Sequence, residues 1–413
     1  MKKISLLALF FIVVFISTEA EDTPLEWAEY QFKLPIPIDY DVDTNTALSL
    51  SVSDLIDLGT YELFDDNRWT RSGGILLNLI CKTSITFTSH EYGHFRVDKQ
   101  TRTGPVGFIN LDDEEDTIEG TNPIETGTYV IIKKFILGHD YGAALFERKE
   151  QKQIFIDNET LVRVLVDAGG LNQEQYNVES LADRLLNKHA HPLNSVLFFM
   201  ESASTLVYPH NDEVGDIEQY FRDLKKLNIS CREDLSTKYA QIGKLFLSGS
   251  SISYGLNISQ YWWSGDKEIE YVGFRYENIF ITWPDFFIYL TSKGPTLKVS
   301  SRIQINENFD FLFGLETNSF FSKEGKEFTE AMIGIHTEFS RFEIDLRLYS
   351  NLQAGNTVEA YGRVEIYEGI SLSGVGRYYN DYTFIRERMS QEIFFNASHD
   401  YEFKIFLEYR IAL

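Results

Sequence analysis

Apolar and polar residues alternate along the chain from about residue 275 to the C-terminus, in segments of roughly ten residues. The clearest segments are TLKVSSRIQIN (296–306), RFEIDLRLYS (341–350), TVEAYGRVEIYE (357–368) and YEFKIFLEYRIAL (401–413). A period of two predicts strands that have one apolar and one polar face. The short joints between the segments predict antiparallel hairpins.

Two architectures agree with this pattern. A soluble sandwich would turn the apolar faces toward a core, and an outer-membrane barrel would turn them toward lipid. The chain has no second apolar layer to cover the sheet, and it ends inside its last amphipathic strand. We therefore expect residues 236–413 to form an antiparallel β-barrel of about 8–12 strands in the outer membrane.

Residues 21–235 have a different pattern, and helices dominate it. The stretch 72–97 contains no proline and is long enough for a helix, and 173–205 predicts two helices joined at Pro192. A short amphipathic helix is expected over 216–227. The stretch 126–170 predicts strands or a hairpin, followed by a helix that breaks at Gly169-Gly170. The expected fold class is α+β, with a helical region followed by the barrel.

The first 20 residues, MKKISLLALFFIVVFISTEA, have the order of a secretory signal peptide: positive residues, an apolar core and small residues at the end. Export is therefore expected, to an outer membrane of the Gram-negative type or to the periplasm. The net charge of −24 disfavours nucleic acid as a partner, because phosphates would be repelled. Two cysteines, Cys81 and Cys231, exclude a disulfide framework and leave one bridge undecided.

The stretch TFTSHEYGHFRVD (86–98) contains His90, Glu91 and His94 in the spacing His-Glu-x-x-His. On a helix, positions i and i+4 share a face, so both imidazoles can bind one tetrahedral Zn²⁺. Glu91 can then act as the general base toward a zinc-bound water. A catalytic zinc site of this kind needs a third protein ligand.

The stretch NVESLADRLL contains Glu179 and, one helical turn later, Asp183. Together with HEYGH, it resembles the Glu-x-x-Ala-Asp element of gluzincin metallopeptidases, especially the membrane family that includes the CaaX-processing proteases and their heat-shock relatives. This resemblance implies a zincin-like helical region with Glu179 as the third zinc ligand and Asp183 as the carboxylate that supports a ligand histidine. Glu174 is the alternative third ligand, and His189 and His191 rank after it.

These features predict an exported zinc metallopeptidase that hydrolyses peptide bonds and is anchored in the outer membrane. Tyr92, His139 and Tyr176 are candidates for stabilising the oxyanion. The expected cofactor is Zn²⁺, and the expected partners are a protein or peptide substrate and outer-membrane lipid. The alternative is a non-enzymatic outer-membrane barrel (a channel, an adhesin or an assembly partner) in which HEYGH is structural.

Overall fold

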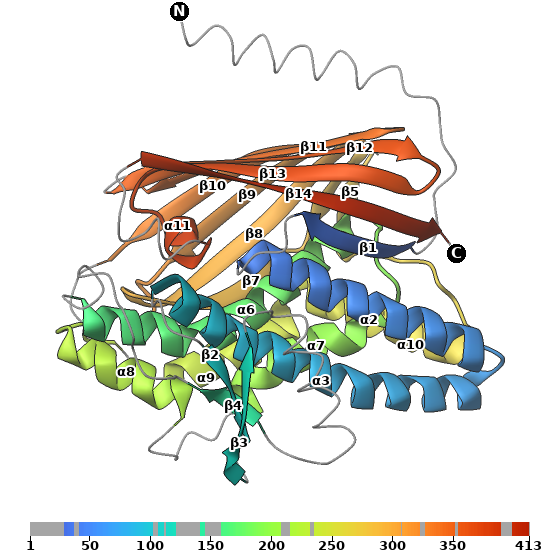
Figure 1. Cartoon of the computed structure of the whole chain (residues 1–413). Helices are drawn as coiled ribbons and strands as arrows, with labels where there is room; N and C mark the ends of the chain where they lie inside the picture. Colours follow the sequence, from blue (N-terminus) through green and yellow to red (C-terminus); the bar gives the residue numbers. More distant parts are fainter. Residues whose placement is uncertain are drawn as a thin grey trace, which may run out of the picture.

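The computed structural model describes residues 29–36, 41–101, 106–110, 113–120, 141–144, 158–207, 215–231, 235–306, 308–322, 327–351, 354–389 and 399–412. The expected signal peptide lies outside these residues. Within them the fold is α+β, as expected, and it has two layers: a large antiparallel sheet and a layer of helices against one of its faces (Figure 1).

Eleven strands form the large sheet, in the order β1-β14-β13-β12-β11-β10-β9-β8-β6-β5, with β7 also paired to β8. Their bounds are β1 Glu29–Ile36, β5 Gly273–Tyr276, β6 Ile279–Thr282, β7 Asp285–Thr291, β8 Gly294–Asn306, β9 Phe309–Thr317, β10 Thr329–Phe339, β11 Phe342–Asn351, β12 Gly355–Tyr367, β13 Ile370–Asp381 and β14 His399–Ala412. The period-two segments are therefore confirmed as antiparallel strands. In the described part of the chain the sheet is not closed, because its edge strands β1 and β5 do not pair with each other.

One strand of the sheet comes from the other end of the chain. β1 pairs antiparallel with β14, from Glu29 opposite Ala412 to Ile36 opposite Ile405. Nothing in the sequence of β1 itself identifies this partner. The sheet therefore joins the N-terminal region to the last strand.

The helical layer consists of α2 (Val42–Phe64), α3 (Arg68–Thr101), α6 (Glu159–Leu186), α7 (Asn194–Val207), α8 (Asp216–Lys226), α9 (Leu235–Leu247) and α10 (Gly249–Ser264). The short α11 (Phe384–Met389) lies next to the sheet, and β2 (Val106–Asn110), β3 (Asp113–Gly120) and β4 (Tyr141–Ala144) form a separate small sheet. α9 and α10 follow the expected domain boundary at 235, so the helical layer continues past it. No helix among the described residues is long and apolar enough to cross a membrane.

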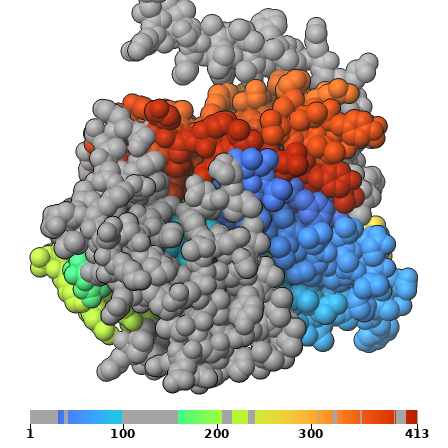
Figure 2. All heavy atoms as spheres, in the orientation of Figure 1, coloured from blue at the N-terminus to red at the C-terminus, as the bar shows by residue number. Residues whose placement is uncertain are grey.

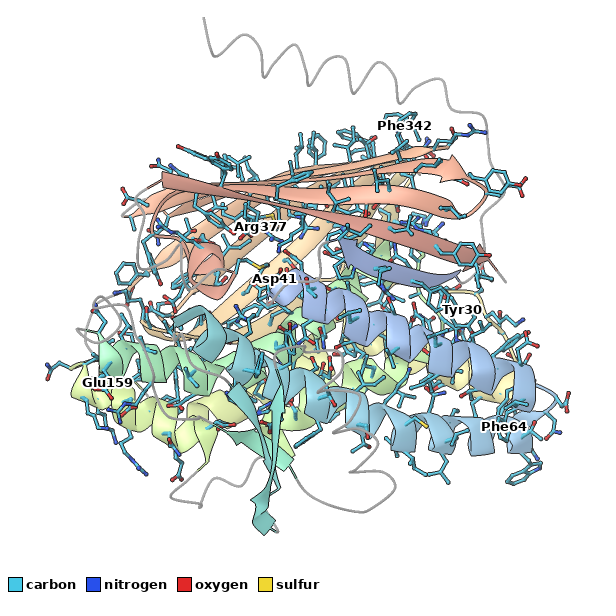
Figure 3. The ribbon with its side chains drawn as sticks, in the orientation of Figure 1. Tyr30, Asp41, Phe64, Glu159, Phe342 and Arg377 are labelled. Carbon is cyan, nitrogen blue, oxygen red and sulfur yellow. The ribbon has the colours of Figure 1, made fainter. Side chains whose placement is uncertain are left out.

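The two faces of the large sheet differ in polarity. On the face toward the helices, Arg347, Glu359, Arg377 and Glu402 lie directly opposite one another on β11, β12, β13 and β14, so that charges of opposite sign alternate across the sheet. Arg377 also donates to Asp43 of α2. Figure 3 shows Arg377 pointing toward the helical layer and Phe342 pointing away from it.

The opposite face of the sheet is apolar and exposed. Its exposed apolar side chains come from seven neighbouring strands and include Leu34, Phe313, Leu315, Ile333, Phe342, Ile344, Leu348, Val358, Ile370, Leu372, Phe403 and Leu407. In the space-filling view, strands coloured orange to red form the upper band of the molecule, directly above the blue α2 (Figure 2). An apolar face that continues over several strands usually marks a surface that contacts another molecule or lipid.

α6 runs without interruption through Gly169-Gly170, so the expected helix break at this pair was wrong. The two glycines lie where α6 crosses α3. A Cβ on Gly93 of α3 would lie 2.2 Å from the carbonyl oxygen of Gly169, and a Cβ on Gly169 would lie 2.6 Å from that of Gly93. Glycine is needed here because the two backbones touch, which outweighs its low helix propensity.

We predict that Gly93→Ala lowers the free energy of unfolding by about 1–3 kcal/mol, because the added methyl group forces the two helices apart. Gly59→Ala on α2 is the matched control, since a Cβ there has no atom within 4 Å. The control should leave stability unchanged or raise it by up to about 1 kcal/mol. Denaturant unfolding measures both. Equal effects of the two substitutions would contradict the close crossing.

Candidate metal centre

His90 and His94 lie on one face of α3 and point toward α6 at the glycine crossing. Both are buried, and their ring centroids are 4.7 Å apart. A Cβ on Gly170 would lie 2.6 Å from His94 Nε2 and 2.7 Å from His90 Nε2. The missing side chain of Gly170 therefore leaves room beside both Nε2 atoms, and the expected helical placement of the motif is confirmed.

The third group at this point is Asp216, the first residue of α8. Its Oδ2 lies 3.1 Å from His90 Nε2 and 3.2 Å from His94 Nε2, and the two Nε2 atoms are 3.0 Å apart. Three potential ligand atoms thus form a nearly equilateral triangle. The Asp216 side chain is 28% exposed, against 3% and 9% for the histidines, so the open side of the site is at Asp216.

The other nitrogen of each imidazole is held by α6. His94 Nδ1 lies 2.6 Å from the carbonyl oxygen of Val166, and His90 Nδ1 lies 3.0 Å from Glu174 Oε1. A carbonyl can only accept, so Nδ1 of His94 must donate, which leaves the lone pair on Nε2. Glu174 acts in the same way on His90, and it also accepts a hydrogen bond from Ser204. A hydrogen-bond acceptor at Nδ1 is characteristic of histidines that bind a metal through Nε2.

The triangle fits Zn²⁺. With bonds of about 2.0–2.1 Å, two ligand atoms on a tetrahedral zinc lie about 3.4 Å apart, slightly more than the spacings found here. Two imidazoles and one carboxylate are also a donor set that zinc accepts in catalytic sites, where the fourth position stays open. His90, His94 and Asp216 are therefore the residues that would hold the ion.

The charges around the triangle favour a cation. Burial lowers the pKa of His90, but the carboxylates of Glu174 and Asp216 outweigh it, and the net pKa is well above the usual value. The pKa of His94 is raised in the same way, against burial, chiefly by Asp216. Burial raises the pKa of Asp216, and the two histidines reverse this and lower it. The site is thus set up to stabilise positive charge between these side chains.

Glu91 lies beside this triangle without being one of its corners. It follows His90 on α3, shares a face with His94 three positions later, and is buried. Its negative charge contributes to the raised pKa of His94. This placement agrees with a carboxylate near the ligands, as the motif predicts.

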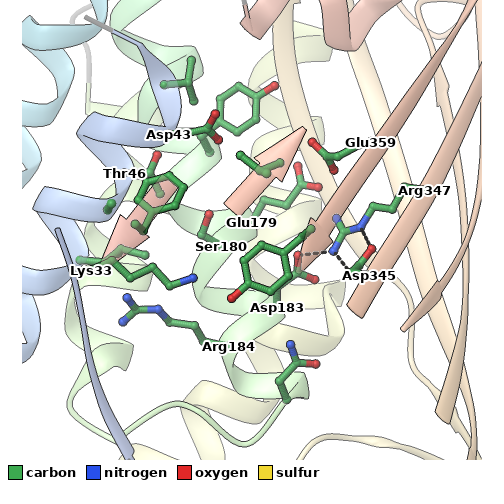
Figure 4. Close-up of a pocket in the computed structure, with 18 of the residues that line it drawn as sticks. Lys33, Asp43, Thr46, Glu179, Ser180, Asp183, Arg184, Asp345, Arg347 and Glu359 are labelled. Carbon is green, nitrogen blue, oxygen red and sulfur yellow. Dashed lines mark hydrogen bonds and ion pairs between the residues drawn. The ribbon is translucent and has the colours of Figure 1, made fainter. Parts of the chain in front are cut away.

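Glu179 and Asp183, the expected third ligand and its supporting carboxylate, lie elsewhere. Glu179 accepts hydrogen bonds from Lys298 and Tyr289 of the sheet. Asp183 accepts from Arg302 at 2.9 Å and Arg347 at 3.0 Å. Both line a charged cavity of about 230 Å³ between α2, α6 and the sheet (Figure 4). The expectation that they share a helix face is confirmed, but this face points to the sheet.

The geometry of α6 gives the physical reason. Gly170 and Glu174 are four residues apart and both face the histidines. Glu179 follows Gly170 by nine residues, which at about 100° per residue is half a turn around the helix. It therefore points away from α3. Glu174, the alternative third ligand, does reach the site, but it contacts Nδ1 of His90 instead of joining the Nε2 atoms.

His189 and His191, the other histidines considered as ligands, do not join the triangle. His189 approaches Glu338 and Glu343 of the sheet, but Arg410 donates to His189 Nε2 at 2.8 Å and to Glu343 at 3.0 Å, so a cation already occupies that group. His191 is buried and stacked on Tyr30, with ring centroids 5.0 Å apart. Burial, helped by Lys82 and Lys267, lowers its pKa well below the usual value.

The three residues expected to stabilise the oxyanion lie in different places. Tyr176 lines the charged cavity on the sheet side of α6, with its ring 5.4 Å from that of Tyr289, so it is not at the histidines. Tyr92 is buried and stacks on Phe95 at 5.9 Å. His139 lies outside the described residues. Cys81 and Cys231 are not joined by a disulfide.

Asp216 could not be recognised from the sequence, because an acidic residue at the start of a helix has an ordinary explanation. It begins α8, and acidic residues are common in the first turn of a helix, where they face the positive end of the helix dipole. Its distance of 122 positions from His94 gives no spacing to recognise. The expected helix over 216–227 is confirmed, but its first residue had no assigned role.

No family model, curated protein or solved structure matches the chain. The likeness to gluzincins is reduced to HEYGH, because the ESLAD carboxylates do not meet the histidines. Assignment of a function therefore depends on the geometry of the triangle.

We predict that Asp216→Ala removes one of three ligands and that zinc is lost during mild dialysis against chelator. Glu174→Gln should keep zinc with an affinity about 10- to 100-fold lower, because it weakens the backing of His90. Glu179→Ala should retain zinc fully. Metal content per chain is the measurement, and Glu218→Ala, in the same first turn of α8, is the matched control. Retention in Asp216→Ala with loss in Glu179→Ala would restore the original assignment.

Proposed function

We propose that the protein is a zinc-dependent metallopeptidase that works at the outer membrane. The observation that carries the proposal is the convergence of His90 Nε2, His94 Nε2 and Asp216 Oδ2 to 3.0–3.2 Å, with both Nδ1 atoms backed by α6. A histidine pair with a purely structural role would not need a carboxylate at Nε2 as well as an acceptor at each Nδ1.

Each residue near the triangle has a task in this proposal. When bound, zinc supplies a Lewis acid that lowers the pKa of a coordinated water and polarises the substrate carbonyl. Glu91 accepts the proton of the attacking water and returns it to the leaving amine. Glu174 and the Val166 carbonyl fix the tautomer and the direction of the two imidazoles. Gly170 keeps the space beside them free of side chains.

The polarity of the sheet supports the membrane part of the proposal. Charges lie on the face toward the helices and are paired there, while the other face exposes apolar side chains over seven strands. The sheet would act as the wall of an outer-membrane barrel does, with its apolar face toward lipid and its charges inside. The signal-like residues 1–20 support export to that membrane.

Glu91→Gln should retain zinc and lose peptide hydrolysis by about 10²- to 10⁴-fold, because a general base is removed and no ligand is. The assay is cleavage of a quenched fluorescent peptide library, with zinc content measured on the same samples. Glu218→Gln, an equal change of charge outside the triangle, should leave the rate unchanged. Full peptidase activity of Glu91→Gln would exclude the proposed metallopeptidase. Bound zinc without peptidase activity in the wild-type protein would favour the non-enzymatic alternative.

Leu407→Arg places a charge in the middle of β14 on the apolar face, where Leu407 is 40% exposed. In lipid this should cost about 2–4 kcal/mol, whereas in water it should cost almost nothing. Glu368→Arg, in the exposed turn between β12 and β13, is the control. Unfolding in lipid bilayers compares the two. Equal stability would argue against lipid on this face.

A further inference from the structure

A surface groove reaches the side of the candidate metal centre where Glu174 contacts His90. It has a volume of about 880 Å³ and lies between α3 and α7. Its walls are apolar, with Ile75 and Phe87 on α3 and Phe199 and Met200 on α7. The buried side chains of His90 and Glu174 also line it. The groove therefore ends at one of the proposed zinc ligands and at the carboxylate behind it.

The groove opens on an apolar surface. Leu76 and Leu79 line it and are 57% and 45% exposed, and Leu77 and Ile80 are exposed beside them. The opposite side of this part of α3 is polar and buried. There Lys82 pairs with Asp57 of α2 at 2.7 Å, and Asn78 donates to Thr60 at 2.8 Å.

Two neighbouring helices also bury polar side chains and expose apolar ones. α2 buries Ser53, Asp54 and Asp57 and exposes Leu55 and Leu63. α10 buries a run of serines with Asn257 and exposes Leu256 and Trp263. A helix in water places its apolar side inside. The reversed order indicates that the surface around the groove mouth contacts an apolar phase.

The groove suits an alkyl chain better than an extended peptide. Both walls are helices, whose backbone groups are bonded within the helix, so a peptide would find no strand edge to pair with. Three of the four hydroxyls that line it already donate to the chain: Ser72 to the Arg68 carbonyl, Thr83 to the Leu79 carbonyl and Ser204 to Glu174. From Ser72 to His90 the groove follows α3 for about 27 Å, more than the roughly 15 Å depth of one leaflet.

We infer that the groove holds the acyl chain of an N-acylated peptide, which enters from the lipid phase with its carbonyl end beside His90. This inference rests on the proposed hydrolase. In the reaction, the oxygen of water bonds to the acyl carbon and the C–N bond breaks. The amine leaves with one proton from water, so the products are a fatty acid and a free amine. An O-acyl glycerolipid carries the same acyl chain on an ester carbonyl. The experiment must therefore distinguish this lipid from the N-acylated peptide.

The test uses full-length protein with the Glu91→Gln change, in lipid nanodiscs, so that binding is read without hydrolysis. The probes are a palmitoyl-peptide and a phosphatidylcholine, each with a photoreactive diazirine on the acyl chain. Labelled residues are mapped by mass spectrometry. We expect the palmitoyl-peptide to label α3 and α7 in the groove, and a dodecanoyl-peptide to compete at least about tenfold better than an octanoyl-peptide.

Leu79→Asn and Leu77→Asn form a matched pair of variants on the exposed side of α3. Leu79 lines the groove and Leu77 does not. Since both are exposed, neither change threatens the fold. Leu79→Asn should reduce labelling at least fivefold, and Leu77→Asn should leave it unchanged. Labelling outside the groove, or equal loss in both variants, would overturn the inference, and so would preferential labelling by phosphatidylcholine.

Hydrolysis is measured separately on protein without the Glu91 change. Groove labelling combined with no release of palmitate would support the binding site and overturn the hydrolase. Cleavage of unacylated peptides without groove labelling would support the hydrolase and overturn the acyl-chain inference. The two failures are therefore distinguishable.

Discussion

The contact between the backbones of α3 and α6 determines the rest of the site. Gly93, Gly169 and Gly170 allow the helix axes to approach until main-chain atoms touch. At that separation α6 supplies the Val166 carbonyl to one histidine and the Glu174 carboxylate to the other. Larger side chains would move these partners beyond hydrogen-bond distance. The direction of both imidazoles thus depends on glycine at these three positions.

The fold places its charges inside and many of its apolar side chains outside. Between the sheet and the helices, Arg302 and Arg347 meet Asp183, and within the helical layer Arg184 of α6 meets Asp54 of α2 at 2.8 Å. Buried ion pairs of this kind add little net stability when the alternative is a packed apolar core. Removal of one partner is costly, however, because it leaves a buried charge alone. The network therefore fixes how the two layers align, and an apolar environment outside would account for the exposed faces.

The sequence predicted what depends on local periodicity and did not predict what depends on helix phase or distant pairing. Period two identified the strands, and the i, i+4 histidines identified two corners of the triangle. α2 and α10 were missed because many of their buried side chains are polar, which hides the usual apolar stripe. Glu179 was preferred to Asp216 because the face of α6 that meets α3 is defined only by the glycine crossing.

The pairing of β1 with β14 has a consequence for how the chain folds. Gln31 of β1 and Glu408 of β14 are hydrogen-bonded across 377 positions of sequence. During synthesis, β1 has no strand to pair with until β14 has been made. Contacts of such long range are slow to form because the entropy of the intervening loop must be lost first. The edge of the sheet is thus completed last, and until then β1 and β14 are exposed to pairing with other chains.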